Sequence, residues 1–169
     1  ESQWIWNVVK DMELTWVNRK AIEKAFAETE RPLGFYIAGA LRDWTSRQGF
    51  EYMKKSSDGG CSWGQYEYAW YFHDGDRGLV EEDKKMFLEL IEKAAAQNNP
   101  KAICVRGRIH EQKKKYNEAF IDQHVATKLG SQSAKICLGE MFYKGDGVEK
   151  DLVQAVYWGS ATVDDDYFW

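Results

Sequence analysis

The C-terminal part of the chain repeats apolar positions with a helical period on both sides of a short loop. Small and large apolar residues recur three and four positions apart from Ala134 to Phe142, and again from Leu152 to Trp158. Residues at this spacing share one face of a helix. Gly145 and Gly147 lie between the two segments. The pattern therefore predicts a helix, a turn and a second helix whose apolar faces meet.

The same arrangement can be followed through the preceding sequence. In each copy of the first helix, a small residue is followed five positions later by another, and the second members are spaced by 30, 38 and 32 residues. Two helices packed about 8–10 Å apart leave no room for a long side chain where they cross. We therefore place these residues at helix crossings and expect four helix pairs. The small residues are Gly34 and Gly39, Gly64 and Ala69, Ala102 and Gly107, and Ala134 and Gly139.

The chain divides into three parts by this pattern. Residues 1–31 precede the first copy, with one helix predicted over Asn18–Glu28 and another over Trp4–Val17. Terminal elements of repeat arrays are atypical because their outer face meets solvent, so we expect residues 1–31 to form an N-terminal cap. The repeats occupy residues 32–163. The tail, residues 164–169, is acidic and then aromatic, and forms either a docked cap or a loose peptide.

Residues Leu138–Trp158 carry Leu-Gly, an aromatic pair, Gly-x-Gly-Val, Asp, Ala and Trp in that order. This segment resembles a Sel1-like repeat, of the tetratricopeptide-related kind. Residues 74–83 resemble the same loop with one residue inserted. Arg106 and His110 depart from the family pattern, which has Leu and an aromatic residue there, and the third loop, residues 112–115, lacks the glycines.

The resemblance extends over about residues 33–163. It implies an all-α fold, a right-handed α-solenoid of about four antiparallel helix pairs. It also implies a scaffold or adaptor for other proteins, with no catalytic chemistry. Analogy of fold does not identify the partner.

Composition narrows the classes of function. The 23 Lys and Arg residues against 27 Asp and Glu give a net charge of −4, which argues against nucleic-acid binding. The longest apolar stretch, Leu33–Leu41, is far shorter than the roughly 20 residues that span a bilayer. The three cysteines have no metal-type spacing, so we expect reduced thiols, no metal, no cofactor and a reducing compartment. The start, Glu-Ser-Gln, is expected of a processed product or of a piece of a longer chain.

Candidate contact residues lie on one stripe of the first helices. Positions three before, one after and four after the second small residue share a helical face. The stripe mixes aromatic rings with both charge signs, and Tyr, Trp and Arg dominate the energetics of many interfaces. The alternative for each ring is packing against a neighbouring repeat. From the stripe we predict partner contacts at Tyr36, Tyr66, Trp70, Arg108, Glu111, Glu140 and Tyr143.

The sequence thus favours a non-catalytic scaffold that binds another protein or peptide through the inner face of the solenoid. A variant of this hypothesis is an accessory subunit of a larger assembly, in which the aromatic residues form an interface. The alternative is an enzyme or small-ligand sensor using His73, Asp76, Arg108 and His110. For Arg106 and His110 the sequence leaves open three possibilities: a buried polar site, a site that accepts an acidic group of a partner, or side chains whose stems pack while their polar ends reach solvent.

Overall fold

The computed structural model describes residues 16–42, 45–73, 75 and 79–160, and in these residues every regular element is an α-helix. Helix α2 lies where the sequence predicts Asn18–Glu28, and four helix pairs follow, as expected. The predicted helix Trp4–Val17, up to residue 15, and the tail, residues 164–169, lie outside the described residues. The helices are α2 (Trp16–Glu28), α3 (Pro32–Ala40), α4 (Arg47–Asp58), α5 (Ser62–His73), α6 (Lys84–Ala96), α7 (Pro100–Gln112), α8 (Tyr116–Lys128), α9 (Gln132–Lys144) and α10 (Leu152–Ser160).

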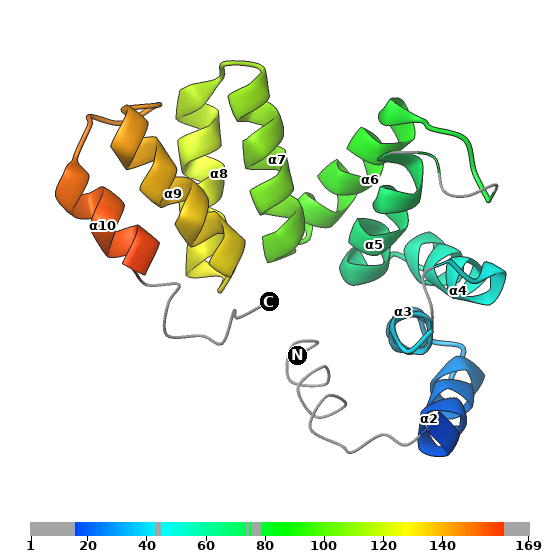
Figure 1. Cartoon of the computed structure of the whole chain (residues 1–169). Helices are drawn as coiled ribbons and strands as arrows, with labels where there is room; N and C mark the ends of the chain where they lie inside the picture. The colour runs from blue at the N-terminus through cyan, green and yellow to red at the C-terminus, as the bar shows by residue number, and fades with distance from the viewer. Residues whose placement is uncertain (1–15, 43–44, 74, 76–78, 161–169) are drawn as a thin grey trace. The chain divides into compact units, whose positions relative to one another are not determined.

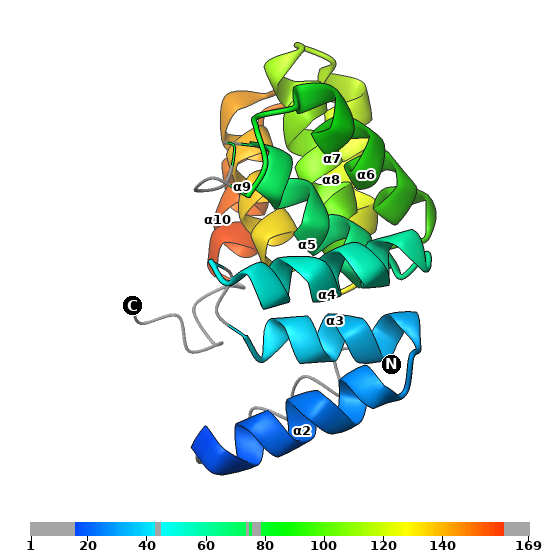
Figure 2. The same ribbon diagram turned by 90° about the vertical axis from the view of Figure 1, so that its right-hand side faces the viewer.

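The chain forms two compact units, Glu1–Leu90 and Ile91–Trp169. In the first unit, consecutive helices run antiparallel, with α3 packed between α2 and α4 and α4 packed on α5 (Figure 2). Helices α3 and α5, the first helices of two successive pairs, also touch each other. The core includes Met53 and Tyr71, and the ring of Phe50 lies 5.1 Å from that of Tyr71.

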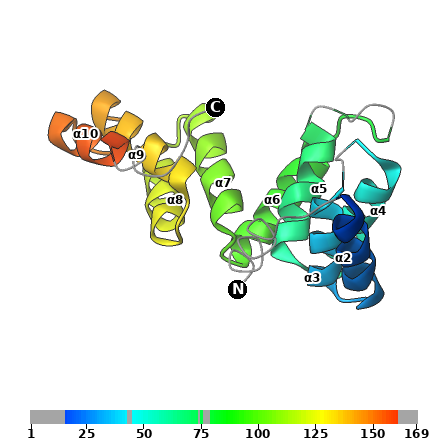
Figure 3. The same ribbon diagram turned by 60° about the horizontal axis from the view of Figure 1, so that its bottom comes forward.

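The second unit repeats this arrangement with α7 to α10 (Figures 1 and 3). Helix α8 packs on α7 and α9, α10 packs on α9, and α7 touches α9. Ile103, Leu138 and Met141 are almost completely buried at these contacts. Within each unit, a helix pair therefore buries apolar surface against the next helix along the chain.

The turns between successive pairs share one backbone conformation. A residue with positive φ stands at Glu30, Gly60, Asn98 and Gly130, with spacings of 30, 38 and 32 residues. These are the spacings of the small residues in the sequence. After three of the residues with positive φ, the next backbone amide makes the same hydrogen bond. The amides of Cys61, Asn99 and Ser131 each donate to the carbonyl five residues earlier. The backbone thus confirms the repeat register independently of the side chains.

The second helices of three pairs begin with a capping side chain. The Asp83 Oδ1 accepts from the amides of Lys85 and Met86, and Asp151 does the same for α10. Ser46 accepts from the amide of Gly49 at the start of α4. Such caps satisfy amides that a helix start leaves free. At the start of α8, Lys115 makes no side-chain cap, consistent with the divergent third loop.

The small residues lie at helix crossings, as the sequence predicts. A methyl group on Gly64 would lie 2.6 Å from Ser56 Cβ on α4, and one on Gly107 would lie 2.6 Å from Gln123 Nε2 on α8. At Gly139 the close atom is the carbonyl oxygen of Ala155, 3.1 Å away. Backbone atoms of the adjacent helix approach Gly64 and Gly139, whereas a side chain of the adjacent helix fills the space at Gly107.

The helices are short, with nine to thirteen residues each. A bilayer requires roughly 20 apolar residues in one helix. In the part of the chain that the structure describes, none has the length and apolar content for that.

The crossing of α4 and α5 provides a stability test. We expect Gly64→Ala to lower the free energy of unfolding by about 1–3 kcal/mol. The new methyl group would lie 2.6 Å from Ser56 Cβ and 3.0 Å from the Ser56 backbone carbonyl carbon. Ser56 cannot rotate away freely, since its hydroxyl donates to the Pro32 carbonyl. The matched control is Gly159→Ala, where a methyl group meets nothing within 4 Å. Thermal unfolding followed by circular dichroism measures both, and equal melting temperatures would contradict the crossing.

Candidate binding surface

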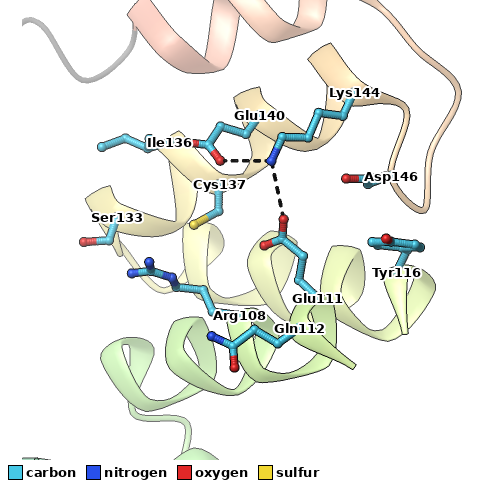
Figure 4. A pocket seen from close by; sticks show the side chains of 10 residues that line it. All are labelled: Arg108, Glu111, Gln112, Tyr116, Ser133, Ile136, Cys137, Glu140, Lys144 and Asp146. Carbon is cyan, nitrogen blue, oxygen red and sulfur yellow. Dashed lines mark ion pairs between the residues drawn. The ribbon is translucent and has the colours of Figure 1, made fainter. Parts of the chain in front are cut away.

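An open cleft of about 680 Å³ lies in the second unit between α7 and α9 (Figure 4). The two helices are the first helices of successive pairs, the positions from which the sequence predicts partner contacts. The start of α8 and the loop after α9 close its end. The lining side chains are Arg108, Glu111, Gln112, Tyr116, Ser133, Ile136, Cys137, Glu140, Lys144 and Asp146.

Lys144 bridges the two helices across this cleft. Its Nζ lies 3.6 Å from Glu111 Oε1 on α7 and 3.5 Å from Glu140 Oε2 on α9 (Figure 4). Partial desolvation lowers the pKa of Lys144, but the two carboxylates together raise the pKa above its ordinary value. All three side chains reach solvent, so these ion pairs orient charges more than they stabilise the fold.

Arg108 is the cation of the cleft that has no carboxylate partner among the described residues. Its side chain is exposed and extends from α7 into the cleft, toward α9 (Figure 4). On α9, Ile136 is 48% exposed on the same cleft. A guanidinium presents a rigid fork of donors that fits a carboxylate or a phosphate. The cleft therefore offers an anion-binding group next to an apolar surface.

The structure brings together three of the seven predicted contact residues. Arg108, Glu111 and Glu140 all line the cleft. Tyr143 lies one turn beyond Glu140 on α9 and is 61% exposed, with the Lys150 Nζ 5.4 Å from its ring centroid. It adjoins the lining residues in sequence without being one of them.

The other three predicted residues belong to the first unit. Tyr36 is only 8% exposed, and burial raises the pKa of its hydroxyl, so this ring is part of the core. Its ring centroid is 6.2 Å from that of Trp63 on the next pair. Tyr36 is thus inaccessible to a partner, because the neighbouring repeat covers it.

Tyr66 and Trp70 are half-buried on α5. The Trp70 ring contacts those of Tyr66, His73 and Phe87, with centroids 6.1, 5.2 and 5.3 Å apart. His73 also stacks edge-on against Phe87 at 4.9 Å. These four residues form an aromatic cluster that leaves part of Tyr66 and Trp70 accessible.

Arg106 and His110 form a polar site around the buried Asp122, while their own side chains remain 26% and 25% exposed. The Arg106 guanidinium donates to both carboxylate oxygens of Asp122 on α8, at 2.9 and 2.7 Å, and this hydrogen bonding raises its pKa. His110 Nδ1 lies 3.1 Å from the same carboxylate, and Asp122 is buried. We call this group the Asp122 clamp. It joins the two helices of the third pair.

The residues of the alternative function are not brought together in the second unit. His110 points to Asp122, whereas Arg108, two residues earlier on the same helix, lines the cleft. His73 packs in the aromatic cluster of the first unit, and Asp76 lies outside the described residues. Within the described residues, no group of three or more His, Cys, Asp or Glu side chains is placed to hold a metal ion.

Sequence reasoning missed several cleft residues. Gln112 and Lys144 both stand five positions after the second small residue of their helix, one position beyond the predicted stripe. Widening the stripe by that one position would have found both. Tyr116 begins α8 and Asp146 lies in the loop after α9. A stripe defined along the first helices cannot predict residues from these elements.

Comparison with known proteins agrees with the repeat register. The Sel1 repeat model matches residues 36–61, 64–99 and 134–160, more than half of the chain. It does not cover the third pair, where the Asp122 clamp replaces apolar residues.

Two solved structures are similar to this chain. A protective antigen present in uropathogenic Escherichia coli strains, displaying an SLR fold, is 24% identical with a TM-score of 0.70, over 83% of this chain and 32% of the antigen. A Sel1 repeat protein from Oxalobacter formigenes is 22% identical with a TM-score of 0.70, over 82% of this chain and 60% of that one. This chain therefore spans less than two thirds of either protein. No curated protein matches it.

The Asp122 clamp provides a second stability test. We expect Asp122→Ala to lower the free energy of unfolding by about 2–3 kcal/mol, because it removes the buried carboxylate that accepts two hydrogen bonds from Arg106 and lies 3.1 Å from His110 Nδ1.

The comparison variant replaces all three residues by the apolar types of the other pairs: Arg106→Leu, His110→Phe and Asp122→Leu. We expect it to be at least as stable as the wild type, since no charge remains to be desolvated. Urea denaturation measures both variants. A triple variant less stable than Asp122→Ala would show that the clamp does not occupy an apolar core position.

Proposed function

The chain belongs to the Sel1 repeat family, whose repeats commonly mediate protein interactions, and we propose that it is a scaffold that binds an acidic peptide segment in the α7/α9 cleft. The observation that carries this proposal is the exposed Arg108, which has no carboxylate partner in the part of the chain that the structure describes, beside the exposed Ile136 in that cleft. Sel1 repeats are typically non-catalytic, and the proposal requires no chemistry beyond binding.

The lining favours a peptide over a small molecule. Sites for small molecules are mostly apolar, with a few polar groups. Five of the ten side chains here are ionisable Arg, Lys, Asp or Glu residues, and the cleft opens along two parallel first helices. A segment of another protein can place charged and apolar groups over such a surface without being enclosed.

The charged side chains of the cleft define which chemical groups the partner should carry. A carboxylate of the peptide would accept both donors of the Arg108 fork, replacing water around the guanidinium. An aliphatic side chain of the peptide would cover Ile136, removing apolar surface from water. Lys144 is already held between Glu111 and Glu140, so it leaves Arg108 as the main site for the acidic group.

The first unit offers a separate contact surface at the accessible parts of Tyr66 and Trp70. Their clustered rings suit a partner with its own apolar or aromatic side chains. We propose this surface as a second contact, which an accessory subunit of a larger assembly would use. Tyr36 is buried and does not form part of this surface.

The cleft proposal is tested by selecting binders from a library of random peptides displayed on phage. We expect enriched peptides to carry an acidic residue near an aliphatic one. Arg108→Glu should raise the Kd of synthetic copies of these peptides by about tenfold or more, because like charges then meet. Fluorescence anisotropy with labelled peptides measures the affinity.

The matched control is Lys128→Glu, the same charge reversal on an exposed residue of α8 that does not line the cleft. Its Kd should stay within a factor of two or so of the wild-type value. Equal losses in the two variants would mean that only the overall charge matters. Peptides without acidic residues, or unaffected by Arg108→Glu, would remove the cleft as the site.

A further inference from the structure

Two of the three cysteines lie on neighbouring helices at the cleft. Cys104 is on α7, one turn before Arg108, and is buried. Cys137 is on α9 and lines the cleft, with its sulfur on the side of Arg108 (Figure 4). Helices α7 and α9 contact each other, and a disulfide between them would hold the two Cα atoms about 4.4–6.8 Å apart.

The two thiols are close enough to influence each other's ionisation. The Cys137 thiol donates to the Cys104 sulfur, which lowers the pKa of Cys104 and raises the pKa of Cys137. The positive charge of Arg108 lowers the pKa of both groups by a smaller amount. The loss of the first proton is therefore a property of the pair of thiols and not of either one alone. The proton that remains is shared between the two sulfurs.

We propose that Cys104 and Cys137 are an oxidisable dithiol, which a small disulfide such as oxidised glutathione converts to a disulfide joining α7 to α9. The cleft gives the oxidant access to Cys137, while Cys104 is covered by protein and in contact with Cys137. This arrangement of one accessible and one buried thiol separates an attacking from a resolving residue. The inference does not depend on what binds in the cleft.

The exchange proceeds in two balanced steps. Cys137 first passes its proton to the Cys104 thiolate. The resulting Cys137 thiolate attacks one sulfur of oxidised glutathione, so that a mixed disulfide forms and one glutathione thiolate leaves. After losing that proton, the Cys104 thiolate attacks the Cys137 sulfur, the bond to glutathione breaks, and the second glutathione thiolate leaves. Two protein thiols are oxidised and one glutathione disulfide is reduced, and the two thiol protons pass to the two glutathiones.

Cys61 serves as the internal control. It belongs to the first unit, immediately before α5, and is half-buried. Cys61→Ser therefore removes a thiol without touching the proposed pair, whereas Cys104→Ser and Cys137→Ser each remove one member.

The experiment incubates the full-length chain with oxidised glutathione and maps disulfide-linked peptides by mass spectrometry without reduction. We expect a Cys104–Cys137 link in the wild type and in Cys61→Ser, reversed by dithiothreitol. Cys104→Ser should accumulate glutathione on Cys137, because the resolving thiol is missing. Cys137→Ser should form no intramolecular link.

Separate glutathione adducts on Cys104 and Cys137 in the wild type, without a link between them, would overturn the proposal. So would an unmodified pair under conditions that modify Cys61. A Cys104→Ser chain that acquires no adduct would overturn the assignment of Cys137 as the attacking thiol. Circular dichroism of each variant confirms that it is folded before oxidation.

Discussion

The close approach of helix backbones at small residues is the constraint on which the structure depends. Each described helix has at most thirteen residues, and those that bury apolar residues do so against neighbouring helices. Short helices gain most of their stability from such packing and little from intrinsic propensity. At Gly64 and Gly107 the adjacent helix occupies the space that a side chain would need. The spacing of small residues therefore sets the spacing of the helix pairs.

The third pair shows that the crossing geometry tolerates a change in what fills the core. Arg106 and His110 stand at positions where the family has apolar residues, and Asp122 stands where two other pairs have Tyr52 and Leu90. The three substitutions compensate one another, since the guanidinium and the imidazole both meet one carboxylate. A family pattern built on apolar types does not match this pair, although its helices and turns keep the register of the others.

The sequence predicted the helices, their pairing and the crossings, because each rests on residue types at fixed spacing. It could not decide which stripe residues stay exposed. Tyr36 and Ile136 hold the same stripe position in different repeats, three residues before the second small residue, yet the ring of Trp63 from the next pair packs on Tyr36, while Ile136 is 48% exposed. Burial of a stripe residue depends on the neighbouring helix. The bridging position of Lys144 was missed for the same reason, since its two carboxylate partners lie on different helices.

The clamp and the cleft are linked through the orientation of α7. Successive residues on a helix are turned by about 100°, so Arg106 and His110 share a face that Arg108 and Glu111 do not. The first face is held against α8 by the two hydrogen bonds from Arg106 to Asp122 and by His110. Because these contacts oppose rotation of α7 about its axis, they direct Arg108 toward α9. The polar residues that depart from the repeat pattern therefore position the side chains that line the cleft.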